Sequence, residues 1–185
     1  DKALLNIDST GVARPKAEGK ATLTVSHGDL RASIPVTVRG LKGAAKPDFI
    51  RDVNPVLNRL GCSAGTCHGA KAGKNGFKLS LRGYDPLYDV RAFGDDHSAR
   101  RVNYASPDDS LMLMKATGAV PHEGGVLTDI HSDYYDVIRQ WIADGAQLDL
   151  ETKKESRMEL FPKHPLIPNI CGSRQDRIMA YFGDG

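Results

Sequence analysis

A pair of cysteines followed directly by a histidine carries the clearest chemistry in this sequence. Cys62 and Cys67 are separated by four residues, and His68 follows the second cysteine. Two thiols can add to the two vinyl groups of haem, and an imidazole beside the second thiol can reach the iron. The usual spacing is two residues, so the loop must bulge, which the small Ala64 and Gly65 permit. The segment predicts one covalent c-type haem, attached at Cys62 and Cys67, with His68 as the proximal iron ligand.

Two other interpretations of this segment stay open. The cysteines could form a local disulfide in an oxidising compartment. They could also bind zinc with His68 and one further ligand, although adjacent Cys67 and His68 side chains rarely serve one tetrahedral site. The sequence has three cysteines, so there is no second pair to complete a zinc site. The third, Cys171, has no evident partner and is expected to be a buried or free thiol.

Two helices are predicted on either side of the motif. The first begins near Asp48, continues with helical spacing of apolar residues and ends at Gly61; Pro55 should kink it unless the regular helix starts there. The second begins at Ser132, a good N-cap, and ends at Gly145. Its predicted buried face consists of Tyr135, Ile138, Trp141 and Ile142. The chain between the helices is rich in glycine, aspartate and proline and is expected to be mostly loop.

The ends of the chain have the alternating, β-branched pattern of strands. Residues 21–38 and 177–182 should therefore be extended and at least partly paired. The predicted class is α+β, with a small, mainly helical cytochrome c-like haem domain flanked by incomplete β-segments. The expected boundaries are residues 1–40 for the first β-segment, 41–46 for a linker, 47–150 for the haem domain and 151–185 for the last β-segment. The two β-segments could pack together.

Composition limits the classes of function. The chain of 185 residues is 40% hydrophobic and 26% charged, which is typical of a globular protein rather than a disordered one. The net charge of +2 gives no reason to expect a nucleic-acid partner. No stretch approaches the roughly 18 apolar residues of a membrane span. The chain opens within a predicted strand and stops at a turn, so we expect it to be part of a larger polypeptide or a processed fragment.

Several segments besides the cysteine motif support a more specific comparison. They are residues 62–68, 73–86, 110–111, 120–125 and 141–146. Together they resemble the planctomycete-type cytochrome c family, over about residues 47–150. Members are large multidomain proteins in which the cytochrome segment lies among bacterial immunoglobulin-like (Ig-like) repeats. The resemblance implies that the flanking segments belong to Ig-like repeats and that the protein is periplasmic or otherwise extracytoplasmic.

The same resemblance suggests where a second axial ligand should lie. Small cytochromes c often carry a Met-Pro pair in the loop before the last helix, where this sequence has Val120, Pro121 and His122. The methionine is absent, so we expect His122 to be the distal iron ligand. Met112 and Met114 are better explained by core packing, and His131 is a weaker candidate.

Charged residues near the motif are candidates for binding the haem propionates. They are Lys74, Arg82 and Arg101. With Lys71 and Lys78, the first two could also guide an acidic redox partner protein, although a solvated loop explains them equally well.

Three functions fit these features. The first is single-electron transfer by a His/His-ligated haem, which makes the protein an electron carrier rather than an enzyme. The second is haem-based catalysis or small-gas sensing at an open distal site. The third is a non-haem Ig-like interaction module with a disulfide- or zinc-stapled insert.

Overall fold

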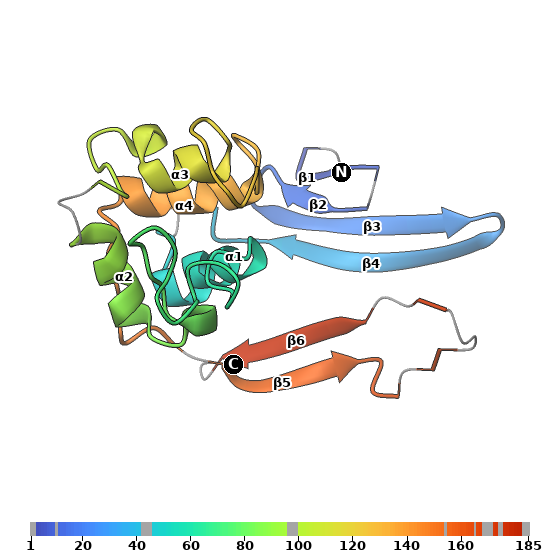
Figure 1. Cartoon of the computed structure of the whole chain (residues 1–185). Coiled ribbons are helices and arrows are strands. Elements are labelled where there is room, and N and C mark those ends of the chain that lie inside the picture. The colour runs from blue at the N-terminus through green and yellow to red at the C-terminus, as the bar shows by residue number, and fades with distance from the viewer. Residues whose placement is uncertain are drawn as a thin grey trace. The chain divides into compact units, whose positions relative to one another are not determined.

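Helices and strands occupy separate segments of the chain, which confirms the α+β class (Figure 1). The computed structural model describes residues 3–9, 11–41, 46–95, 100–153, 155–164, 166–167, 172–173 and 176–182. The chain divides into two units, residues 1–45 and 46–185. Cys171 lies outside the described residues, so its predicted role stays a prediction.

The first unit consists of two antiparallel strand pairs. β1 (Leu5–Ile7) pairs with β2 (Ala13–Pro15), and β3 (Gly19–His27) pairs with β4 (Leu30–Val38). The predicted extended, paired structure of residues 21–38 is therefore confirmed. Because side chains alternate between the two faces of a strand, the cross-strand pairs Leu23–Ile34 and Val25–Ala32 fall on one apolar face. Val25 and Ile34 are 53% and 49% exposed.

The first predicted helix is confirmed, but it opens with a wide π-helical turn. Asp48 accepts the backbone N–H three residues further on at 2.7 Å and so caps the turn η1 (Phe49–Val53), which continues directly into α1 (Asn54–Arg59). Pro55 lies in the first turn of α1, where no intrahelical partner is lost, so the regular helix starts at the proline. Gly61, at φ +80°, ends the helix and leads into the cysteine loop.

The last helix lies where the sequence predicted it. α4 runs from Asp133 to Ala143, and the Ser132 hydroxyl accepts the backbone N–H of Tyr135 at 3.3 Å. Gly145 follows the helix at φ +93°. The predicted face is buried: Tyr135, Ile138, Trp141 and Ile142.

The stretch between these helices is more regular than predicted. It contains α2 (Pro86–Gly94) and α3 (Leu111–Ala116), two short helices that the sequence did not predict, although most of the stretch is loop, as expected. Asp85 caps α2 by accepting the backbone N–H of Tyr88 at 3.0 Å, and a proline occupies the first turn. Two short 3₁₀ turns complete the stretch, η2 at Leu81–Gly83 and η3 at Pro107–Asp109.

The core of the helical part is built around aromatic side chains. Phe49 and Phe93 both lie against Trp141, with ring centroids 5.1 and 6.3 Å away, and all three are almost fully buried. Phe77 continues the series, 5.2 Å from Phe93. This aromatic stack joins η1, α2 and α4 to the segment that follows the cysteine motif.

A buried carboxylate fixes that segment to α2. Asp89 accepts the backbone N–H of Ser80 at 2.6 Å and its hydroxyl at 2.7 Å. Burial raises the pKa of the Asp89 carboxyl, partly offset by these two hydrogen bonds. The next residue towards the motif, Leu79, donates its N–H to the His68 carbonyl at 2.8 Å. The chain on the far side of the motif is thus anchored to the core.

The end of the chain forms a third hairpin. β5 (Glu155–Phe161) pairs antiparallel with β6 (Arg177–Phe182), which confirms the predicted strand at 177–182. Among the described residues every sheet has two strands. In the same part of the chain no helix has the length and apolar character to cross a membrane.

Candidate cofactor site

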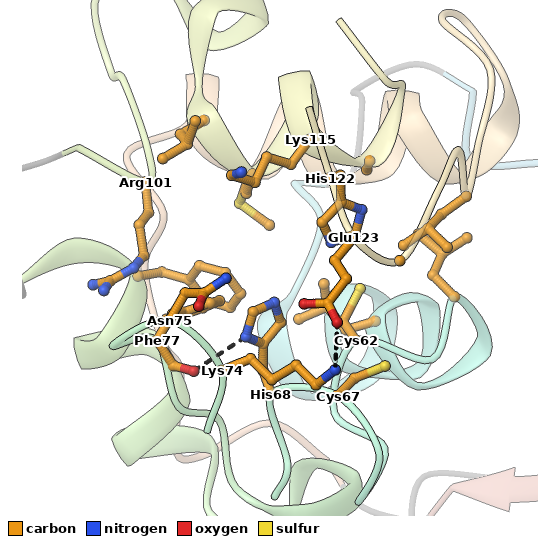
Figure 2. A pocket seen from close by; sticks show the side chains of 18 of the residues that line it. Cys62, Cys67, His68, Lys74, Asn75, Phe77, Arg101, Lys115, His122 and Glu123 are labelled. Atoms are coloured by element: carbon orange, nitrogen blue, oxygen red, sulfur yellow. Dashed lines mark hydrogen bonds and ion pairs between the residues drawn. The ribbon is translucent and has the colours of Figure 1, made fainter. Parts of the chain in front are cut away.

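A cavity of about 540 Å³ lies beside the cysteine motif (Figure 2). Pockets of roughly 300–1,000 Å³ are typical of sites for cofactors and other small molecules. All three motif residues, Cys62, Cys67 and His68, line the cavity. His122 also lines it, although it is separated from His68 by more than fifty residues of sequence. The structure therefore brings together the four residues predicted for attachment and axial ligation.

The loop between the cysteines bulges outward, as its length required. Gly65 and Thr66 are exposed, whereas the cysteines at either end line the cavity. Backbone hydrogen bonds fold the bulge, including Cys67 N–H to the Ala64 carbonyl at 2.9 Å and His68 N–H to the Cys62 carbonyl at 3.0 Å.

A glycine makes this compact loop feasible. A Cβ on Gly69 would lie 2.1 Å from the carbonyl oxygen of Ser63, so the chain can cross here only without a side chain. Ser63 is itself fixed, because its hydroxyl donates to the Asn58 side chain at 2.6 Å and its carbonyl accepts the N–H of Arg82 at 2.9 Å. The loop therefore sets the positions of both thiols and of His68.

Both cysteines carry free thiols in this structure. Burial, with a smaller contribution from Cys67, raises the pKa of Cys62 to about 11 from an ordinary value of 9.0. Cys62 is thus a neutral thiol at physiological pH.

The predicted proximal ligand, His68, presents one defined nitrogen to the cavity. The His68 Nδ1 lies 3.1 Å from the Phe77 carbonyl oxygen, so it carries the proton and leaves the Nε2 lone pair for a metal. The His68 ring also packs on the Phe77 ring, with centroids 4.6 Å apart. Burial lowers the pKa of His68, partly offset by the hydrogen bond to Phe77, and the nearby His122 lowers it further. His68 is therefore neutral, the form that binds metals.

The distal candidate has the same arrangement on a different segment. The His122 Nδ1 lies 3.0 Å from the carbonyl oxygen of Gly125, which again leaves Nε2 for a ligand. A Cβ on Gly124 would come within 2.8 Å of the His122 ring, so a side chain there would displace the ring from this position. Figure 2 shows the His68 and His122 rings entering the same space from different segments.

The charged side chains that line the cavity are mainly basic. Among the described residues, the basic ones are Lys74, Arg100, Arg101 and Lys115, and the one carboxylate is that of Glu123. Arg101 is only 8% exposed; it donates to the Ala92 carbonyl at 2.8 Å and stacks over the Phe77 ring at 4.4 Å. Sequence reasoning missed Lys115, which comes from α3 and donates to the Pro121 carbonyl at 2.8 Å. Had α3 been predicted, the position of Lys115 on that helix would have indicated that it lines the cavity.

Four other candidates have different outcomes. Arg82 does not line the cavity; its side chain is exposed on η2, so the structure does not support it as a propionate ligand. His131 and Met114 line a second pocket, beside Asp108 and Arg139. Met112 does line the cavity, within its apolar wall.

The zinc interpretation receives no support within the described residues. In that part of the chain, no three His, Cys, Asp or Glu side chains gather closely enough to hold a metal ion.

No protein-family model matches this chain, and neither a curated protein nor a solved structure matches it significantly.

Proposed function

We propose that residues 47–150 form a monohaem c-type cytochrome domain that transfers single electrons. One haem would be attached covalently through Cys62 and Cys67, and His68 and His122 would supply ligands to its iron. One observation carries this proposal: the two thiols and the two imidazoles line one cavity, and each imidazole bonds a backbone carbonyl through Nδ1.

The remaining lining of the cavity suits a flat apolar group with two carboxylates. Its inner wall consists of side chains such as Leu57, Phe93 and Ile138, which exclude water. Its basic side chains, including Arg101 and Lys115, could pair with the propionates. The fit thus rests on size, polarity and charge as well as on the ligand set.

Bound haem would supply a one-electron iron couple. The residues of this chain would control its setting: Cys62 and Cys67 hold the ring, and His68 and His122 supply two neutral nitrogen donors. Two imidazoles lack the methionine thioether that raises the potential, so we expect a low potential. The basic rim would favour a redox partner protein with an acidic docking surface.

The flanking segments and the location follow from the family resemblance. We propose that the hairpins β3–β4 and β5–β6 belong to Ig-like repeats of a larger extracytoplasmic protein. The half-exposed apolar face of β3–β4 supports this, because a two-stranded hairpin is marginally stable unless another layer covers such a face.

The test is covalent attachment. The chain is expressed with a cytochrome c maturation system and separated on a denaturing gel. Haem staining should give a coloured band, and the intact mass should exceed that of the polypeptide by one haem. Cys67→Ser should retain at most one thioether bond.

The matched control is His131→Ala, which lies at the second pocket and should load haem normally. A colourless product whose mass is that of the polypeptide with a Cys62–Cys67 disulfide would refute the proposal.

A further inference from the structure

The two imidazoles that line the cavity differ in how strongly the surrounding structure fixes them. His68 packs on Phe77, which joins the buried aromatic stack through Phe93. The Phe77 carbonyl that bonds His68 is itself fixed, because it also accepts the backbone N–H of Lys74 at 2.8 Å. Moving His68 would therefore disturb the core.

His122 lies on a short span that is anchored at its ends. Val120 N–H donates to the Met114 carbonyl at 3.2 Å, and Leu127 N–H donates to the Ala116 carbonyl at 2.8 Å, so both ends are tied to α3. Residues 121–126 between these anchors are called the distal loop below. The hydrogen bond of the His122 ring is to Gly125, within the same loop. Turning the distal loop outward would carry His122 and its partner away together.

An ion pair crosses from this loop to the opposite wall of the cavity. Lys74 Nζ lies 3.4 Å from the Glu123 carboxylate, and the two side chains are 42% and 71% exposed (Figure 2). Lys74 belongs to the turn whose Phe77 carbonyl holds His68. The Lys74–Glu123 contact, called the rim ion pair below, therefore links the loop that carries His122 to the segment that fixes His68.

We infer that the rim ion pair controls how readily His122 leaves the iron, and that a small neutral ligand such as carbon monoxide can bind on that side. This inference rests on the proposed function. Exposed ion pairs contribute little and are screened by salt, so the rim ion pair delays opening without preventing it. The site would then combine electron transfer with reversible binding of a small ligand on the His122 side.

The experiment is stopped-flow mixing of the reduced holoprotein with carbon monoxide. At high carbon monoxide concentration, the limiting rate equals the rate at which His122 dissociates. Glu123→Gln and Lys74→Gln should each raise this rate by about two- to fivefold, the range expected for an exposed ion pair. The double variant should be no faster than the faster single variant, since both changes remove the same contact.

The two single variants also separate the rim ion pair from a general charge effect. Removing a negative charge near the iron and removing a positive one should move the reduction potential in opposite directions. Loss of the ion pair should raise the limiting rate in both. Rates that change in opposite directions, or not at all, overturn the inference.

Asp95→Asn is the matched control, since it removes the exposed Arg91–Asp95 pair on α2, away from the cavity lining. Its limiting rate should equal that of the wild type. In 1 M salt the wild-type rate should approach that of Glu123→Gln, because screening then acts within about 3 Å.

A second readout does not depend on ligand binding. Hydrogen–deuterium exchange of the peptide that covers the distal loop should be faster in both single variants than in the wild type. Unchanged exchange would overturn the inference while leaving haem attachment intact. A chain without haem would instead refute the proposed function, so the two failures are distinguishable.

Discussion

A hydrogen bond at Nδ1 decides which nitrogen an imidazole can offer to a metal. His68 and His122 both bond a backbone carbonyl through Nδ1, at 3.1 and 3.0 Å. This arrangement fixes the tautomer and the ring orientation before any ligand binds. Two such histidines on one cavity are a stronger indication of a paired ligand set than either of them alone.

Replacing His122, the proposed second iron ligand, should leave the iron of bound haem accessible to small ligands. His122→Ala is expected to convert a low-spin absorption spectrum to a high-spin one and to let carbon monoxide bind at once. His131→Ala should keep the wild-type spectrum, because the His131 side chain is 79% exposed beside Asp136 at 3.7 Å. If His122→Ala keeps a low-spin spectrum, Met112, which also lines the cavity, becomes the ligand to test.

The Cys62 thiol should react slowly with alkylating reagents. The thiolate is the nucleophile, and the raised pKa of Cys62, about 11, leaves little thiolate near neutral pH. In haem-free chain carrying Cys67→Ser and Cys171→Ser, the rate of iodoacetamide labelling at Cys62 should keep rising beyond pH 10. In urea the rate should level off near pH 9. A plateau near pH 9 in the folded chain would show that Cys62 is not desolvated.

For single residues, prediction from the sequence was most specific where the residue belongs to a recognisable motif. Adjacency and spacing indicated that Cys62, Cys67 and His68 belong to one site. The resemblance to cytochromes placed His122 there too, and all four residues line the cavity. Arg82 was included only because it is basic and close in sequence. Its neighbours turn it outward, since the Arg82 N–H bonds Ser63 and its φ is +54°. Such a direction is a property of the folded loop and cannot be read from composition.

Among the elements, the cysteine loop is limited by backbone contact. Gly69→Ala would place a Cβ 2.1 Å from the Ser63 carbonyl oxygen, and backbone cannot move aside as a side chain can. The change should lower the free energy of unfolding by about 1–3 kcal/mol, as overpacking typically does. Urea denaturation of the holoprotein measures the loss.

The same loop provides the control. A Cβ on Gly65 would meet only the Leu81 side chain, at an ordinary 3.6 Å. Gly65→Ala should therefore leave the unfolding midpoint close to that of the wild type. Equal effects of the two substitutions would mean that the loop is looser than its hydrogen bonds indicate.

Helix prediction succeeded where apolar spacing was long and failed where the helix was short. α4 has eleven residues with a clear buried face, and its cap and end were both evident. α2 has nine residues, and only Ala92, Phe93 and the unexpected Asp89 are buried, so its apolar pattern is weak. The start signal was nevertheless present, because Asp85 and Pro86 form an N-cap followed by a first-turn proline. Glycine and aspartate in the surrounding chain correctly indicated loop there, and the short helix between them was missed.

For the whole molecule, the division at residue 45 predicts that the proposed haem site functions independently of the first unit. All residues of the cavity lie in the second unit. A chain that starts at Lys46 should therefore attach haem and show the same oxidised and reduced spectra as the full chain. A changed spectrum would mean that the first unit contributes to the site.

The hairpin β3–β4, released alone, should associate through its apolar face, which size-exclusion chromatography would detect.

The position of Trp141 determines how strongly the holoprotein should fluoresce. It is the single tryptophan of the chain and lies in the aromatic stack that reaches Phe77, a residue of the cavity wall. Haem absorbs at the wavelengths at which tryptophan emits, so excitation energy would pass from Trp141 to the haem. The folded holoprotein should therefore show almost no tryptophan fluorescence. A thioether-bound acceptor stays on the chain when the protein unfolds. Emission recovered in denaturant would therefore measure the growing separation between Cys67 and Trp141, free of any contribution from cofactor loss.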